Sequence, residues 1–146
     1  MFKKILVAYD ESPEAARALA TAIDLAKQLN AQIHLVTVRE PLPAYLGYAE
    51  AAFPGSRRVL TDERQIFYRN LHHKAKAQAE AQGLTIEGEI IEGNEVDSLA
   101  DCIQSWQADL FVIGRRHHPS SFSRFSPGTV HEVAERTRCS ILAVME

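Results

Sequence analysis

The chain has few of the features that identify specialised proteins. It contains two cysteines, Cys102 and Cys139, which form neither a CxxC pair nor a zinc-ligand spacing. No stretch approaches the roughly 20 apolar residues that a membrane span requires. The first residues lack the apolar region and the small-residue cleavage site of a signal peptide. We therefore expect two buried, reduced thiols, no metal site, no membrane partner and a cytoplasmic location.

An excess of charge of one sign is also missing. The 16 lysines and arginines are nearly balanced by 19 aspartates and glutamates, which leaves a formal net charge of −3. A chain with this charge balance is not expected to bind nucleic acid through its overall charge. Hydrophobic residues make up 46% of the chain, which is enough for one core in 146 residues. The totals predict one domain over residues 1–146, without a nucleic-acid partner.

Five short apolar runs predict buried β-strands, because each is too short for a core helix. They cover residues 3–9, 32–38, 84–91, 109–113 and 140–145. The segments between them show helical spacing, with capping residues at Ser12 and Asn94. Strands that alternate with helices pair in parallel through right-handed crossovers. The pattern predicts an α/β fold with a five-stranded parallel sheet and helices on both faces.

One connection departs from this alternation. Residues 39–60 contain three prolines and two glycines, so we expect an irregular segment there. A helix is expected over residues 59–82, in which His72 and His73 point in different directions. We interpret these two as surface or partly buried histidines rather than as a joint metal site.

The carboxyl ends of parallel strands are where ligands bind in folds of this kind. Asp10 follows the first strand, and Val38 ends the second. Asp10 has two interpretations that its position alone does not separate. Its carboxylate can accept hydrogen bonds from ribose hydroxyls, or it can cap the turn that leads into the next helix.

The segment from Gly114 to Thr129 joins the fourth strand to the last helix. Gly114 is expected to let the backbone leave the strand tightly, and Gly128 to begin a helix whose free amides can bind phosphate. Between the glycines lie cations, hydroxyls and imidazoles but no acid: Arg115, Arg116, His117, His118, Ser120, Ser121, Ser123 and Arg124. This composition favours an anionic ligand. The alternative is a solvated loop anchored by Phe122 and Phe125. The GxxxxGK[ST] and GxGxxG patterns are absent, so a nucleotide site must use other geometry.

Several segments together resemble the universal stress protein family. Residues 5–12 read ILVAYDES and resemble the family's first strand, acidic residue and helix cap. Residues 109–114 read DLFVIG and resemble its fourth strand and glycine. Residues 128–130, GTV, and 139–144, CSILAV, resemble its closing helix and strand. The resemblance covers nearly the whole chain. It implies a Rossmann-like three-layer sandwich of the adenine-nucleotide alpha-hydrolase type.

The ATP-binding members of this family share a glycine pattern. It consists of a glycine, two residues, a glycine, nine residues, and then glycine followed by serine or threonine. Gly114 matches the first glycine, and Gly128 with Thr129 matches the last pair. His117 stands where the middle glycine is expected, and the span is one residue longer. Either an imidazole of His117 or His118 replaces the lost backbone contact, or the loop no longer binds a triphosphate.

The resemblance implies a site for ATP, with Mg²⁺ as a candidate companion. Asp10 would contact the ribose, the backbone of Val38 would bind the adenine edge, and Ala8 and Tyr9 would line the base pocket. The residues implied around the phosphates are Gly114, Arg116, His117, Gly128, Thr129 and Val130. The resemblance also implies a homodimer through the last strand, residues 140–145, whose apolar edge invites strand pairing.

Three functions follow from these observations. The first is a cytoplasmic stress-response protein that binds ATP or a related adenine nucleotide as a regulatory homodimer. The second is a scaffold of the same fold without a nucleotide, favoured by the departure at His117. The third is a phosphohydrolase. Asp10 is the one acid that the sequence places at the pocket, so at most slow ATP hydrolysis is expected.

Overall fold

The structure of the protein, a computed structural model, describes residues 1–116 and 127–145. The elements follow the order β1 (Lys4–Ala8), α1 (Pro13–Leu29), β2 (Gln32–Arg39), α2 (Leu46–Ala52), α3 (Ser56–Glu80), β3 (Glu87–Glu92), α4 (Glu95–Trp106), β4 (Leu110–Arg115), α5 (Pro127–Arg136) and β5 (Ser140–Met145). All five predicted strands are present, with shifted ends in most of them. In the described ranges, no helix is both long enough and apolar enough to cross a membrane.

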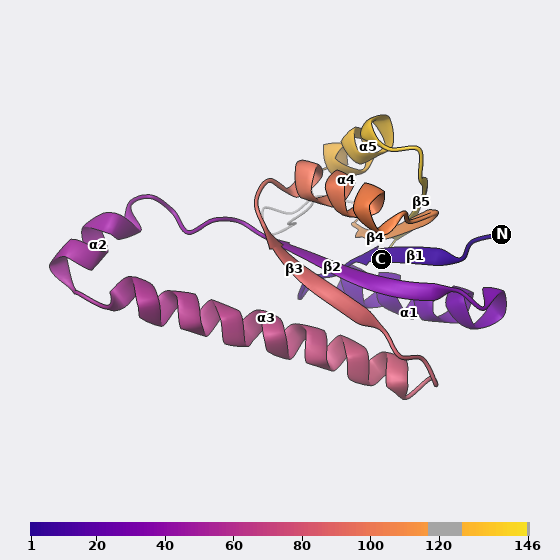
Figure 1. Ribbon diagram of the computed structural model, residues 1–146, viewed down its shortest axis with the longest axis horizontal. Coiled ribbons are helices and arrows are strands. Elements are labelled where there is room, and N and C mark those ends of the chain that lie inside the picture. Colours follow the sequence, from indigo (N-terminus) through magenta and orange to yellow (C-terminus); the bar gives the residue numbers. More distant parts are fainter. Residues whose placement is uncertain (117–126, 146) are drawn as a thin grey trace.

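The five strands form one parallel sheet in the order β3-β2-β1-β4-β5. Helices α1 and α3 cover one face, and α4 and α5 cover the other, which gives three layers (Figure 1). This arrangement confirms the predicted α/β fold. The chain leaves β1 toward one face and β4 toward the other, so the strand order reverses between these two central strands.

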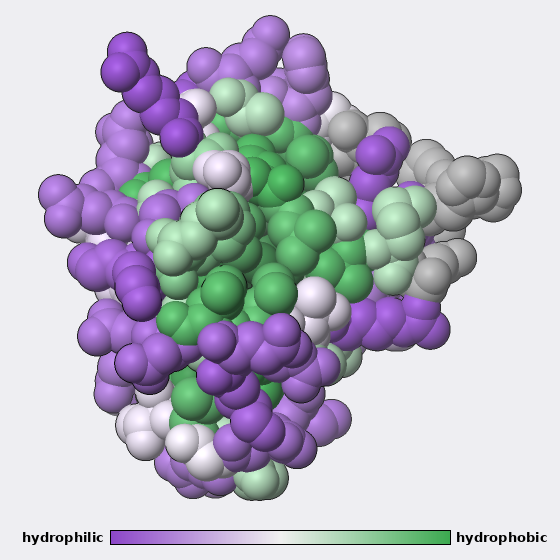
Figure 2. Space-filling model, turned by 90° about the vertical axis from the view of Figure 1, so that its right-hand side faces the viewer, coloured by the Kyte–Doolittle hydropathy of each residue, from purple (hydrophilic) through white to green (hydrophobic). Residues whose placement is uncertain are grey.

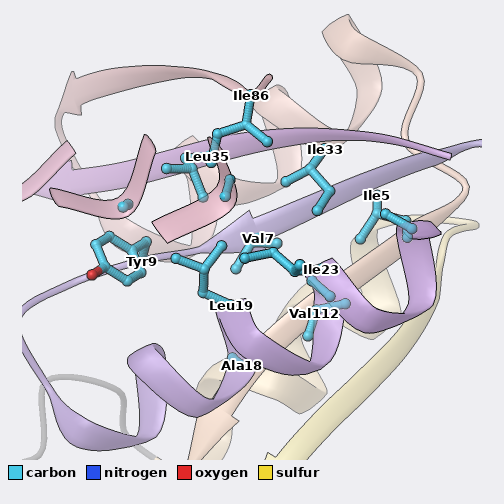
Figure 3. Close-up of a cluster of buried hydrophobic side chains, with 14 of the residues drawn as sticks. Ile5, Val7, Tyr9, Ala18, Leu19, Ile23, Ile33, Leu35, Ile86 and Val112 are labelled. Atoms are coloured by element: carbon cyan, nitrogen blue, oxygen red, sulfur yellow. The ribbon is translucent and has the colours of Figure 1, made fainter. Parts of the chain in front are cut away.

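The central strands are buried on both faces, and their side chains alternate between two cores. Ile5 and Val7 of β1 pack toward α1 and α3, whereas Leu6 and Ala8 pack toward α4 and α5. Figure 3 shows the first of these cores, in which Leu19 of α1 lies against the sheet. Burial on both faces explains why the strands appear in the sequence as continuous apolar runs.

Helix α1 begins and ends at the residues that its capping signals indicate. The Ser12 hydroxyl accepts a hydrogen bond from the Ala15 N–H at 3.2 Å, and Pro13 occupies the first helical position. Asn30 adopts the left-handed conformation with φ 52° and ends the helix. Because these signals are local, sequence reasoning could place this helix closely.

The connection after β2 is more regular than predicted. Helix α2 occupies Leu46–Ala52, and α3 already begins at Ser56, so the expectation of an irregular segment over residues 39–60 was wrong. The prolines Pro43 and Pro54 flank α2 rather than interrupt it. Figure 1 shows α2 and the start of α3 standing beyond the carboxyl end of β2, away from the sheet.

Candidate functional site

The predicted site residues gather around the carboxyl edge of the sheet, at the point where the strand order reverses. Strand β1 ends at Ala8, β4 ends at Arg115, and α5 begins at Pro127. The helices that follow these strands, α1 and α5, lie on opposite faces of the sheet, an arrangement that places ligands at this edge in sheets of this type. This edge is therefore where a ligand is expected to bind.

Ala8 and Tyr9 form the buried floor of this edge. Ala8 packs in the α4–α5 core and Tyr9 at the margin of the α1–α3 core (Figure 3). The Tyr9 N–H donates to the Val36 carbonyl at 2.9 Å, and the Tyr9 carbonyl accepts a hydrogen bond from the Thr37 hydroxyl at 2.6 Å. Burial, and then the Asp10 carboxylate, raise the pKa of the Tyr9 phenol. The phenol is therefore neutral at physiological pH.

Asp10 is buried at the end of β1. Its Oδ1 accepts a hydrogen bond from the Ser12 N–H at 2.8 Å, which is the geometry of a turn-capping aspartate. The capping interpretation therefore holds for this oxygen. A carboxylate offers about four acceptor positions, so the single bond from the Ser12 N–H does not use all of them.

Val38 directs its backbone groups toward the β1 side of β2, just past the end of β1. Strand β2 continues to Arg39, whereas β1 pairs with it only as far as Ala8, opposite Val36. The Val36 carbonyl points toward β1, because it accepts the hydrogen bond from Tyr9. Alternate residues of a strand present their N–H and C=O groups to the same side. Val38 therefore presents one donor and one acceptor beyond the last β1–β2 pair.

Gly114 has a different role from the predicted exit from the strand, and that prediction was wrong. It lies inside β4, opposite Val144. A Cβ at this position would come within 2.3 Å of the Glu14 carbonyl oxygen and 2.8 Å of the Ala15 nitrogen. Both neighbours are backbone atoms, which cannot move aside cheaply. The glycine is required because β4 packs directly against the first turn of α1.

Glu14 is a residue of this edge that the sequence analysis did not identify. It is buried in the first turn of α1, and its Oε2 lies 3.0 Å from Nε of Arg116. Arg116 was predicted beside phosphates, and its guanidinium donates a hydrogen bond to Glu14. Asp10 is therefore not the single acid at this edge. The pair joins the beginning of α1 to the segment that leaves β4.

Helix α5 begins at Pro127, one residue before the predicted start. Gly128, Thr129 and Val130 therefore lie in its first turn, whose N–H groups are not used by the helix itself. Thr129 is buried, and the Val130 side chain packs in the α4–α5 core, so this turn offers a ligand mainly its backbone. His117, the remaining predicted residue, lies outside the described residues.

A hollow of about 570 Å³ opens beside Thr129. Three glutamates, Glu40, Glu95 and Glu132, contribute to its lining. Their negative charge disfavours a bare phosphate and favours one that is accompanied by a cation. The sequence analysis did not place these acids at the edge, because they come from three separate segments of the chain.

A buried hydrogen-bonded chain connects the floor of the site to α3. The Thr37 hydroxyl donates to the Tyr9 carbonyl, and its oxygen lies 2.6 Å from Nε2 of His72. Because the hydroxyl has one proton, His72 is the donor in this arrangement, with its proton on Nε2. Burial, followed by Lys76 and His34, lowers the pKa of His72 to about 4. His72 is therefore neutral at physiological pH.

The interpretation of the two helical histidines was wrong for one of them, since His72 is buried and His73 is exposed. One signal in the sequence could have pointed to this pairing. Thr37 follows Ile33 and Leu35 at alternate positions of β2, which puts a hydroxyl on the buried face. A buried hydroxyl requires a hydrogen-bonding partner from the covering helix.

Comparisons with known proteins are consistent across the whole chain. The sequence model of the Universal stress protein family matches residues 1–145. A universal stress protein of Thermus aquaticus is 31% identical over an alignment of 148 positions, which covers 99% of each chain.

Two solved structures share the fold at low sequence identity. A universal stress protein from Archaeoglobus fulgidus, in complex with dAMP, is 20% identical with a TM-score of 0.68, and the match covers 98% of both chains. A universal stress protein family protein from Arabidopsis thaliana, with AMP bound, is 14% identical with a TM-score of 0.69. That match covers 99% of this chain and 92% of the other. These likenesses establish the Rossmann-like α/β fold.

Proposed function

This chain belongs to the universal stress protein family, and we propose that it binds an adenine nucleotide at the carboxyl edge of its sheet. The observation that carries the proposal is the backbone of Val38, which presents a donor and an acceptor beyond the end of the β1–β2 ladder. The family's solved members with dAMP and AMP support the same class of ligand.

The remaining parts of a nucleotide have partners in the same crevice. The Asp10 carboxylate lies at the end of β1, where a ribose hydroxyl can donate to it. The first turn of α5, with Gly128 and Thr129, supplies backbone amides and the positive end of a helix dipole for a phosphate. Base, sugar and phosphate are thus assigned to three elements that meet at one edge.

We propose ATP with Mg²⁺ as the physiological form of the ligand. The hollow beside Thr129 is lined by Glu95 and Glu132, and Arg116 forms an ion pair with Glu14. A polyphosphate that binds beside these acidic side chains needs a counter-ion. Mg²⁺ supplies this charge when it is bound to the β- and γ-phosphates. AMP carries less charge and depends less on the ion.

Isothermal titration calorimetry of the purified protein tests this proposal. We expect micromolar ATP binding that strengthens when Mg²⁺ is added. Asp10→Ala is expected to weaken ATP binding by about tenfold or more, because it removes a charge-assisted hydrogen bond. Gly128→Val is expected to weaken it as well, because a branched side chain crowds the first turn of α5.

Two further variants separate ligand binding from the turn. Asp10→Asn retains an acceptor for the Ser12 N–H but removes the charge, so it should fold normally and still bind ATP more weakly. Asp24→Ala, an exposed aspartate farther along α1, serves as the matched control and should bind ATP like the natural protein. Absence of ATP and AMP binding in the presence of Mg²⁺ contradicts the proposal.

The second candidate function is a scaffold of the same fold that binds no nucleotide. The ion pair of Arg116 with Glu14 favours it, because this guanidinium is already engaged by a buried carboxylate. The departure from the glycine pattern at His117 also favours it. Chromatography of the heat-extracted protein distinguishes the two, since a scaffold should release no adenine nucleotide.

We also propose that the protein acts as a regulatory homodimer through β5. This strand is the sheet edge, and Ile141, Leu142, Ala143 and Val144 are each partly exposed. A shallow hollow beside it has an almost wholly apolar lining: Met1, Phe2, Leu25, Leu29, Leu110, Ser140, Ile141 and Leu142. Figure 2 looks onto this end of the molecule and shows a hydrophobic area surrounded by polar side chains. An apolar edge of this kind favours association.

Light scattering coupled to size-exclusion chromatography tests the dimer. The natural protein is expected to elute as a dimer, and Leu142→Glu as a folded monomer, because the charge would be buried without a partner in the interface. A natural protein that remains monomeric at high concentration contradicts this proposal and leaves the nucleotide proposal unaffected.

A further inference from the structure

A histidine, a glutamate and a cysteine meet on the α4 side of the sheet, outside the nucleotide edge. His34 Nε2 lies 3.3 Å from Glu89 Oε1, and the Cys102 thiol donates to the same oxygen at 2.9 Å. The three atoms all lie within 4.8 Å of one another. They come from three elements: the paired strands β2 and β3, and helix α4, which covers this face of the sheet.

The sheet register explains why these residues converge. Val36 of β2 pairs with Glu89 of β3, and His34 lies two residues before Val36. His34 and Glu89 are therefore diagonal neighbours on the same face, and this face is the one that α4 covers. Cys102 projects from α4 into the gap above them. The arrangement is a consequence of the fold and involves residues far apart in the sequence.

Neighbouring groups fix the imidazole in place. The Trp106 ring stacks on the His34 ring, with centroids 5.2 Å apart. The Lys4 ammonium lies 5.3 Å from the Trp106 ring centroid and donates a hydrogen bond to the Trp106 carbonyl at 3.1 Å. These contacts limit the rotation of His34 and hold Nε2 toward Glu89. Preorganised ligands of this kind reduce the entropy that metal binding loses.

The three residues also differ in exposure in a way that suits a metal site. Cys102 is buried and the His34 side chain is 16% exposed, whereas the Glu89 side chain is 44% exposed. The site is therefore closed on the protein side and open to water past Glu89. An ion can enter from this side, and a water molecule can occupy a fourth coordination position.

We propose that His34, Glu89 and Cys102 bind a Zn²⁺ ion, with water as the fourth ligand. Zinc accepts imidazole, carboxylate and thiolate together, and its bond lengths of about 2.0–2.3 Å put tetrahedral ligand atoms about 3.3–3.8 Å apart. The His34–Glu89 and Cys102–Glu89 separations are 3.3 Å and 2.9 Å, and no pair of the three atoms is more than 4.8 Å apart, so small side-chain rotations complete the site.

Binding requires one proton to leave the protein. The Cys102 sulfur forms a bond to zinc as its S–H bond breaks, and the proton passes to solvent along the exposed side of Glu89. His34 binds through Nε2 in the tautomer that carries its proton on Nδ1. No oxidation or reduction takes place. The ion would tie the edge strand β3 and helix α4 to β2.

Cobalt titration of the untagged, reduced and metal-depleted protein tests this site directly. Co²⁺ takes the same tetrahedral ligands as Zn²⁺, and a thiolate ligand gives a strong charge-transfer absorption band. We expect this band to saturate at one equivalent and to disappear when Zn²⁺ is added. Zinc should also raise the melting temperature, because it binds only the folded chain.

Three variants decide which residues hold the ion. Cys102→Ser should lose the charge-transfer band, whereas Cys139→Ser, which alters the other cysteine, should keep it. Glu89→Gln keeps an acceptor for the Cys102 thiol but removes the anionic ligand. It should fold normally and bind Zn²⁺ more than about tenfold more weakly.

Three outcomes overturn the proposal: absence of the band in the natural protein, persistence of the band in Cys102→Ser, and equal Zn²⁺ affinity in Glu89→Gln and the natural protein. In each case the three residues form only a hydrogen-bonded cluster that covers a buried thiol. Because Glu89→Gln preserves the hydrogen bonds, its result is informative even if Cys102→Ser does not fold.

Discussion

Helices α1 and α3 cover the same face of the sheet, but they are attached to it in different ways. Helix α1 buries an apolar face along its whole length: Ala15, Ala18, Leu19, Ala22, Ile23 and Ala26. Helix α3 is longer, yet its buried residues, Tyr68, His72, Ala75 and Ala79, all lie in its second half. Its first half exposes Val59, Leu60 and Ile66, and no residue of α2 is buried.

The difference divides the carboxyl edge into two parts. Asp10 and Glu14 are buried on the α1 side, and Gly114 packs closely against the backbone of α1 there. On the other side, β2 leads into α2 and the outer half of α3, which have little of the sheet beneath them (Figure 1). Low local burial is typical of segments that open at small free-energy cost. We infer that the α1 side is the fixed wall of the crevice and the α2–α3 side is the adjustable one.

The same substitution at Gly114 and at Gly47 is expected to give the largest difference in stability between the two sides of the edge. Gly114→Ala places a Cβ 2.3 Å from the Glu14 carbonyl oxygen, so it should lower the free energy of unfolding by at least about 3 kcal/mol. Gly47→Ala in α2 meets no atom within 4 Å and should leave stability unchanged or raise it by up to about 1 kcal/mol. Urea unfolding monitored by circular dichroism measures both. Equal losses in the two variants would mean that α2 is packed as tightly as α1.

A second pair removes the same number of carbon atoms from each helix. Leu19→Ala in α1 deletes a fully buried side chain and should destabilise the protein by about 3 kcal/mol. Ile66→Ala in α3 deletes a side chain that is 56% exposed and should change stability by less than about 0.5 kcal/mol. The same urea experiment measures both differences. A loss above about 1.5 kcal/mol for Ile66→Ala would contradict the division and indicate that the outer half of α3 is covered.

These two helices also show what sequence reasoning could predict. The ends of α1 follow from Ser12, Pro13 and Asn30, which act within one turn of the chain, and the strands follow from buried apolar runs. The short helix α2 was missed because the flanking prolines and the glycine in its first turn are typical of irregular segments. Capping residues and apolar runs therefore predicted helices and strands correctly where the packing of the folded chain favoured the same structure.

The candidate site was only partly predictable, for a physical reason. Asp10, Val38 and Gly128 could be placed at the edge because each lies at the end of an element. The pair of Glu14 with Arg116 could not, since 102 positions separate the two residues and only the strand order brings them together. Gly114 could be recognised as special, but its reason, the backbone of α1, is visible only in three dimensions.

The smallest expected effect is on the pH dependence of stability. It concerns the second half of α3, which packs against the sheet and includes the buried His72. The pKa of this imidazole is lowered to about 4, whereas in the unfolded chain it is about 6.5. As the pH falls from 6.5 toward 4, the unfolded state takes up a proton that the folded state does not, so folding stability decreases over this window.

The decrease due to His72 is expected to reach about 2 kcal/mol, after allowance for partial solvent screening. Urea unfolding at pH 7 and pH 4.5 measures it, because His72→Gln should lose less stability between these pH values than the natural protein. His73→Gln, which alters the exposed neighbour, should lose as much as the natural protein. If His72→Gln and His73→Gln show the same pH dependence, the buried imidazole of His72 does not cause the loss of stability at low pH. If only His72→Gln is flatter, the burial of neutral His72 beside Thr37 accounts for that loss, and the contact of the second half of α3 with the sheet depends on pH.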